Sequence, residues 1–164
     1  MKILISIALY VFLTSNIITY NYDDKTKNTD PISTKEHKIN MDYLTDTRGW
    51  KLYRITSDKP CDTNNDGIKN TEIIQEMPTC ALDDMLFIRK ENNKAYYERG
   101  ILCDNQPKEE AYDWTLLDNK FIMSQGNDSP DTMEIISLDD KKMVMAIQME
   151  ALGELYIFTV TFKH

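Results

Sequence analysis

The chain has 164 residues, a formal net charge of −8 at pH 7 and hydrophobic residues at 41% of its positions. This length allows one domain with a modest core, and only five glycines and five prolines exclude collagen-like and low-complexity classes. No cluster of lysine and arginine offsets the acidic charge, so we predict no nucleic-acid partner, because such binding depends on cationic side chains that displace counterions.

Residues 1–20 predict an export signal. One positive charge at Lys2 precedes an unbroken apolar run over 3–13. That run has the length of a signal-peptide core, whereas a membrane-spanning helix needs about 20 apolar residues. No A-x-A cleavage motif follows, so an uncleaved anchor is the alternative and the only membrane contact that we expect. We predict an exported protein of the periplasm, the cell envelope or the extracellular space.

The rest of the chain divides into a linker and one domain. Residues 21–43 mix both charge signs without helical or strand periodicity, which predicts a flexible, disordered N-terminal arm. From residue 44 to 164, short β-rich runs alternate with turn signals. The predicted strands cover residues 50–56, 85–90, 95–102, 111–117, 120–124, 132–138, 142–150 and 154–163. Residues 71–78 predict one short helical turn that Pro78 ends.

The short connections determine how these strands pair. Consecutive strands joined by a few residues are antiparallel neighbours. Closing the sheet removes its exposed edges, and eight strands enclose either their own side chains or one small ligand. We therefore predict an all-β, eight-stranded, antiparallel up-and-down barrel whose first and last strands pair. In the strand 142–150, the methionine face should point inward.

Several segments resemble a known family. They are LTDTRGWKL from Leu44, the loop DTNNDG, Cys80 followed by Asp83, Asp84 and Phe87, Cys103, Trp114 in YDWTL, and the closing YIFTVTF. Together they resemble the small lipocalin-like domain proteins exported by Bacteroidetes-type bacteria, over about residues 44–164. The resemblance implies a lipocalin-like barrel in the cell envelope, in a family whose members mostly have no assigned biochemical role. The lipocalin pattern has one residue between Gly and Trp, whereas Gly49 and Trp50 are adjacent here.

Three cysteines predict one disulfide and one free thiol. An exported chain reaches an oxidising compartment, where disulfides persist. Cys80 precedes and Cys103 follows the predicted hairpin of residues 85–102, so both lie at its open end, within reach of a bridge. We predict the pair Cys80–Cys103, with Cys61–Cys80 as the alternative. No C-x-x-C motif supports a zinc site.

The loop CDTNNDGIKNTE begins like an EF-hand calcium loop, with oxygen ligands at alternate positions before Gly67. Its candidate Ca²⁺ ligands are Asp62, Asn64, Asp66, Ile68 (through its main-chain carbonyl) and Glu72. The rest of the loop departs from the EF-hand pattern, because Ile73 stands at position 12, where the bidentate glutamate belongs, and Glu72 comes one residue early. The loop is therefore either a weak calcium site or, with a slight preference, a turn in which Asp and Asn cap their own backbone. Calcium is the only cofactor that the sequence suggests.

The sequence contains no catalytic signature. One histidine lies in the linker and the other, His164, at the last position, where burial is hard to arrange. No G-x-S-x-G, H-E-x-x-H, phosphate-binding or dinucleotide-binding motif is present. The carboxylate pairs at 83–84, 109–110 and 139–140 indicate solvated turns, because adjacent strand residues point to opposite faces. We predict that the protein is not an enzyme.

Aromatic and methionine side chains favour two functions instead. Thioethers adapt to irregular shapes, so the barrel would bind a small apolar or amphiphilic ligand in an internal cavity. The alternative is a structural or protein-interaction module of the cell envelope with a filled barrel and an exposed apolar patch. Arg89 and Arg99, if they point inward, would pair with a ligand carboxylate. The candidate ligand-binding residues are Tyr97, Trp114, Met143, Met145, Met149 and Phe158.

Overall fold

The computed structural model describes residues 39–64, 66–103, 107–151 and 153–164, so the predicted signal peptide and most of the predicted linker lie outside the described residues. The helical elements are α2 (Met41–Leu44), η1 (Ile73–Glu76) and η2 (Thr79–Ala81). The strands are β1 (Trp50–Cys61), β2 (Asn70–Glu72), β3 (Met85–Arg89), β4 (Lys94–Glu98), β5 (Glu109–Leu117), β6 (Lys120–Ser124), β7 (Asp131–Leu138), β8 (Lys142–Ala151) and β9 (Glu154–Lys163). Within these residues no helix is long and apolar enough to span a bilayer.

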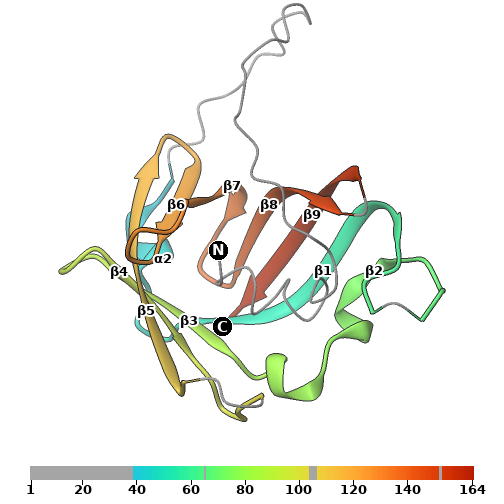
Figure 1. Cartoon of the computed structure of the whole chain (residues 1–164). Coiled ribbons are helices and arrows are strands. Elements are labelled where there is room, and N and C mark those ends of the chain that lie inside the picture. The colour runs from blue at the N-terminus through green and yellow to red at the C-terminus, as the bar shows by residue number, and fades with distance from the viewer. Residues whose placement is uncertain (1–38, 65, 104–106, 152) are drawn as a thin grey trace, which may run out of the picture.

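The strands close into an antiparallel barrel (Figure 1). From β3 to β9, each strand pairs with the next one along the chain. One edge of β1 pairs with β9 over Lys51–Ser57, and the other edge pairs with β3 at Trp50 and Lys51. The short strand β2 continues along that second edge toward Cys61. The predicted eight-stranded up-and-down barrel, closed by its first and last strands, is therefore confirmed, with β2 as an addition to it.

Strand alternation places the core inside this ring. On β8, Met143 and Met145 are fully buried, which confirms that the methionine face points inward. On β9 the inward side chains from Tyr156 to Phe162 are at most 5% exposed, whereas Leu155 and Ile157 on the outer face are about half exposed. The interior is therefore lined by apolar side chains from every wall of the barrel.

Two features of the fold were not predicted. The helix α2 covers the last residues of the predicted linker, where the Asn40 side chain caps it by accepting the N–H of Asp42. A four-residue helix is too short to show periodicity in the sequence. The strand β1 runs on to Cys61, because it pairs with β9, which lies far away in sequence, and then with the short strand β2. The short helix η1, in contrast, agrees with the predicted helical turn.

The strand β4 ends at Glu98, so the prediction that it reaches residue 102 is wrong. Beyond Glu98 the chain turns away from β3 and passes close to the segment before that strand. A Cβ atom built on Gly100 would lie 2.5 Å from Oδ2 of Asp83. The disulfide that holds Cys103 to Cys80 maintains this turn. A strand pattern in the sequence carries no information about either contact.

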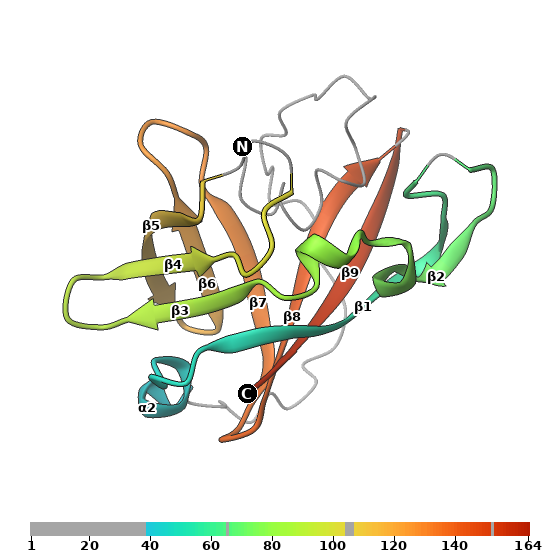
Figure 2. The ribbon, with the colours of Figure 1, turned by 90° about the horizontal axis from the view of Figure 1, so that it is seen from below.

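Trp50 joins the two ends of the domain at the base of the barrel. Its indole N–H donates to the carbonyl of Leu44 at 3.0 Å, which ties β1 to α2, the helix beside it in Figure 2. The indole also stacks on the ring of His164, with centroids 3.9 Å apart, and His164 Nδ1 donates to the carbonyl of Gly49. The His164 side chain is only 8% exposed, so the expectation that a terminal histidine escapes burial is wrong.

We expect Gly49→Ala to destabilise the domain by about 2 kcal/mol. Gly49 has φ +75°, and a Cβ there would lie 2.6 Å from Cε1 of Phe87, so the variant combines backbone strain with steric overlap. Gly67→Ala is the matched control, because Gly67 has φ +84° but no atom within 4 Å of its Cβ position. The control should lose only about 1 kcal/mol. Urea unfolding measures both, and equal losses would refute the steric part.

Candidate functional site inside the barrel

The structure brings the predicted ligand-binding residues to the inner face of the barrel. Tyr97 and Trp114 come from β4 and β5, and Phe158 comes from β9; these three are at most 7% exposed. The three methionines of β8 spread along the barrel, because Met143 pairs with Phe162 near the base and Met149 pairs with Tyr156 near the other end. Whether these side chains contact a ligand stays a prediction.

Among the described residues, apolar side chains of the barrel interior pack against one another. Trp114 stacks on Phe121 with ring centroids 5.7 Å apart, and its indole N–H donates to the carbonyl of Arg89. Tyr97 meets Tyr112 edge to face at 6.2 Å. The described residues also outline a shallow hollow, but it lies at the outer base of the barrel, between residues 139–142 and the end of β9. An internal cavity for a ligand stays a prediction.

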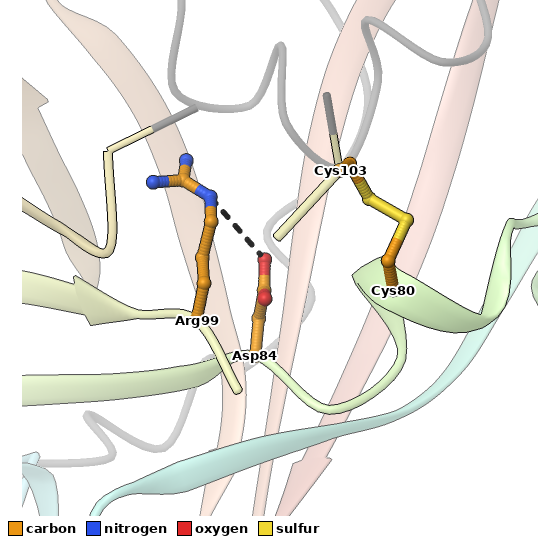
Figure 3. Close-up of a disulfide and its surroundings, with 4 residues drawn as sticks. All are labelled: Cys80, Asp84, Arg99 and Cys103. Carbon is orange, nitrogen blue, oxygen red and sulfur yellow. Dashed lines mark ion pairs between the residues drawn. A yellow bond between two sulfur atoms is a disulfide. The ribbon is translucent and has the colours of Figure 1, made fainter. Parts of the chain in front are cut away.

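Sequence reasoning missed a buried polar cluster at the other end of the barrel. Arg99 is 2% exposed, and its Nη2 donates to Oε2 of Glu110 at 2.9 Å. The same Glu110 oxygen accepts the hydroxyl of Tyr112 at 2.5 Å, while Arg99 Nη1 donates to the carbonyl of Pro107. Asp84 completes the cluster, with Oδ2 3.9 Å from Nε of Arg99 (Figure 3).

Strand alternation points this cluster inward. Asp84 directly precedes β3 and has the same orientation as the buried Leu86. Arg99 follows β4 in phase with Tyr97, and Glu110 lies on β5 in phase with Tyr112. The prediction that the pairs 83–84 and 109–110 mark solvated turns is therefore wrong for one member of each. The sequence signal for this orientation was the strand alternation itself, because Asp84 lies one residue before β3 and Arg99 one residue after β4, each in the inward phase.

The cluster holds more acidic groups than basic ones. Burial raises the pKa of the Asp84 carboxyl to about 6 against the opposing effect of Arg99, and Asp83 and Glu110 raise it further. Burial and the neighbouring Glu110 also raise the pKa of the Tyr112 hydroxyl. Among the described residues, Oδ1 of Asp84 is buried without a hydrogen-bond partner. Oδ1 of the neighbouring Asp83 is likewise buried without a partner, so the cluster contains two acceptor atoms that receive no hydrogen bond from the described residues.

Comparison with known proteins shows the family of this chain. The model of the family described as "Lipocalin-like domain" matches residues 44–145, which is more than half of the chain. This chain belongs to the lipocalin-like domain family. Among solved structures, the protein is similar to bovine odorant-binding protein in complex with undecanal, at 18% identity over 79% of this chain and 77% of the other, with a TM-score of 0.43. It is also similar to aphrodisin, a sex pheromone from female hamster, at 13% identity over 70% and 71%, with a TM-score of 0.41. No curated protein matches the chain.

The predicted disulfide of this lipocalin-like protein is confirmed. Cys80 and Cys103 are bonded, with their Cα atoms 5.5 Å apart, and the bridge lies beside Asp84 and Arg99 (Figure 3). Cys61 is a buried free thiol, so the alternative pair Cys61–Cys80 is wrong. The bridge therefore holds together the two segments that carry the buried acid and base.

Reduction of this bridge should destabilise the lipocalin-like domain by about 3 kcal/mol, because the unfolded chain loses a constraint on the loop between residues 80 and 103. Guanidinium unfolding with and without reductant measures the loss. The double variant Cys80→Ser/Cys103→Ser should match the reduced protein and should not respond to reductant. A loss below about 1 kcal/mol would contradict the expectation.

The acidic loop of this lipocalin-like protein uses its side-chain oxygens on its own backbone. Asp62 accepts the N–H groups of Asp66 and Gly67, and Asn64 Oδ1 also accepts the N–H of Asp66. Asp66 in turn accepts the N–H of Ile68 at 2.7 Å. These are the contacts that the turn interpretation predicts.

Glu72, the fifth candidate calcium ligand, forms an ion pair with Arg54, in which Nη2 and Oε2 are 2.5 Å apart. This pair lowers the pKa of the Glu72 carboxyl. Among the described residues, no group of three or more His, Cys, Asp or Glu side chains could hold a metal ion. A calcium site in this loop stays a prediction.

The raised pKa of Asp84 makes the stability of the lipocalin-like domain depend on pH. The folded state binds this proton more tightly than the unfolded state, whose carboxyl has an ordinary value of 3.8. The resulting stabilisation is fully present below about pH 4 and is lost as the pH rises through about 6. We expect the wild type to gain about 1 kcal/mol relative to Asp84→Asn between pH 7.5 and pH 5, measured by urea unfolding. Parallel pH profiles of the two proteins would contradict this.

Proposed function

We propose that this protein binds a small apolar or amphiphilic molecule inside the barrel. Eight strands are the number at which a barrel can enclose one small ligand, as lipocalins do. The walls that would surround the ligand carry the buried side chains of β4, β5, β8 and β9. These buried apolar walls support the proposal that the interior accommodates an apolar molecule.

A methionine wall carries this proposal. Five methionines lie on the inner faces of the adjacent strands β6, β7 and β8: Met123, Met133, Met143, Met145 and Met149. Thioether side chains have three rotatable bonds and repack at low cost around irregular shapes. A ligand can enter this closely packed interior by displacing methionine side chains, which a wall of branched or aromatic residues would resist.

Binding fits this interior better than catalysis. Arg99 and Tyr112 are held by Glu110, and proteins of the lipocalin family typically bind molecules rather than transform them. We also propose that the protein is exported. The apolar run at residues 3–13 supports export, and so does the Cys80–Cys103 bridge, because disulfides persist in oxidising compartments.

Calorimetric titration with decanol tests the proposed function. We expect saturable one-to-one binding, weakened about fivefold in Met149→Ala, because a half-buried methionine would lose its contact with the ligand. Gln148→Ala is the matched control, since Gln148 precedes Met149 on β8 but lies exposed on the outer face. Absence of saturable binding, or equal effects of the two substitutions, would contradict the proposal.

A further inference from the structure

We propose that the polar cluster around Asp84 recognises a protonated amine, so that the ligand of the barrel is an apolar molecule with an ammonium head group. This inference rests on the proposed function and names the chemical class of ligand for the same interior. Asp84 carries the inference through its inward position, through an oxygen that accepts no hydrogen bond from the described residues and through the negative charge around it.

Asp84 lies where an interior ligand would meet it. Its side chain is 6% exposed and, like that of Leu86, points inward. Figure 3 shows the Asp84 carboxylate directed toward Arg99. The inner face continues from Asp84 through Tyr97 to the apolar walls. An elongated ligand can therefore place its head at this cluster and its chain along the methionine wall.

The hydrogen bonds of the cluster leave an acceptor for such a head group. Glu110 Oε2 accepts from both Arg99 and Tyr112, and Arg99 Nη1 is engaged with the carbonyl of Pro107. Among the described residues, Oδ1 of Asp84 accepts no hydrogen bond, and neither does Oδ1 of the adjacent Asp83. A buried acceptor without a donor is unfavourable, and an ammonium group supplies up to three donors.

The charge balance selects a cation. In the described part of the chain, Asp84 and Glu110 face one guanidinium, that of Arg99, and the carboxylate of Asp83 lies next to Asp84. The Tyr97 hydroxyl on β4 adds no positive charge to this environment. A ligand carboxylate would meet excess negative charge, so pairing of Arg99 with a ligand carboxylate, which the sequence suggested, is disfavoured. An ammonium group would neutralise that excess in a site of low dielectric constant, where the interaction is strong.

Three ligands with the same ten-carbon chain test the inference: decylamine, decanol and decanoate. At pH 7.5 we expect decylamine to bind about tenfold more tightly than decanol, because it adds a charge-assisted hydrogen bond, and decanoate to bind more weakly than both. In Asp84→Asn, the preference for the amine should disappear while decanol binding stays. Glu98→Gln is the matched control, since it removes a carboxylate from an exposed position on β4 and should keep the preference.

The wild type alone provides a second test, which applies even where a variant fails to fold. Burial raises the pKa of Asp84 to about 6, so this carboxyl changes charge between pH 7.5 and pH 5. The charged and titratable groups that surround it are Asp83, Glu110, Arg99 and Tyr97. The amine preference should therefore fall several-fold at pH 5, while decanol affinity stays constant. Decanol binding without an amine preference, or a preference that neither Asp84→Asn nor low pH reduces, would overturn this inference and leave the proposed function intact. Failure of all three ligands to bind would overturn the proposed function itself.

Discussion

Replacing Arg99 by methionine is expected to destabilise the domain by about 3 to 5 kcal/mol. The guanidinium is 2% exposed, and its removal leaves the carboxylates of Glu110 and Asp84 buried without a compensating charge. The loss should be smaller at pH 5, because Asp84, whose pKa is about 6, is then protonated. Urea unfolding at the two pH values measures both effects.

Two controls separate charge from packing at Arg99. The triple variant Arg99→Met/Glu110→Gln/Asp84→Asn should recover much of the loss, because no uncompensated buried charge remains. Arg54→Met removes an arginine–glutamate pair from the surface, where the Arg54 side chain is 57% exposed, and should have a much smaller effect than Arg99→Met. A triple variant as unstable as the single one would show that the guanidinium matters through its packing.

Trp50→Ala should cost about 3 to 5 kcal/mol as well. Trp50 is fully buried, and its removal creates a cavity and deletes both its hydrogen bond to Leu44 and its stack on His164. Because these contacts join α2, β1 and β9, we also expect faster amide exchange in the pairing of β1 with β9. Tyr53→Ala removes a large side chain from the outer face of β1 and should have a much smaller effect, since Tyr53 is 55% exposed. Comparable losses for the two variants would contradict this role of Trp50.

The order and closure of the strands could be predicted from the sequence, because several strands alternate apolar and polar residues and short turns connect them. On β8 and β9, apolar residues alternate regularly, so the sequence alone identifies the inner face of these strands. Short turns such as Asn92–Asn93 fixed the order of the strands, and the observed positive φ of Asn93 agrees with that interpretation. Barrel closure followed from the number of strands.

The polar cluster escaped prediction for a physical reason. Asp84 and Glu110 each stand beside a second acidic residue, and such pairs ordinarily occur in solvated turns. Their burial depends on Arg99, which reaches them only because β3, β4 and β5 lie side by side and a disulfide holds the adjoining loops. Alternation indicates the inward phase of these positions, but it does not reveal the contacts among them, which tertiary structure sets.

Binding of a small molecule among the methionines of the barrel interior can be observed by NMR, with carbon-13 labels on the methionine methyl groups during a decanol titration. We expect saturable shifts at the inner methionines Met133, Met145 and Met149, with intermolecular contacts to the decanol chain, and no shift at Met85 on the outer face of β3. Unchanged inner methyl signals at saturating decanol, or shifts confined to Met85, would contradict it.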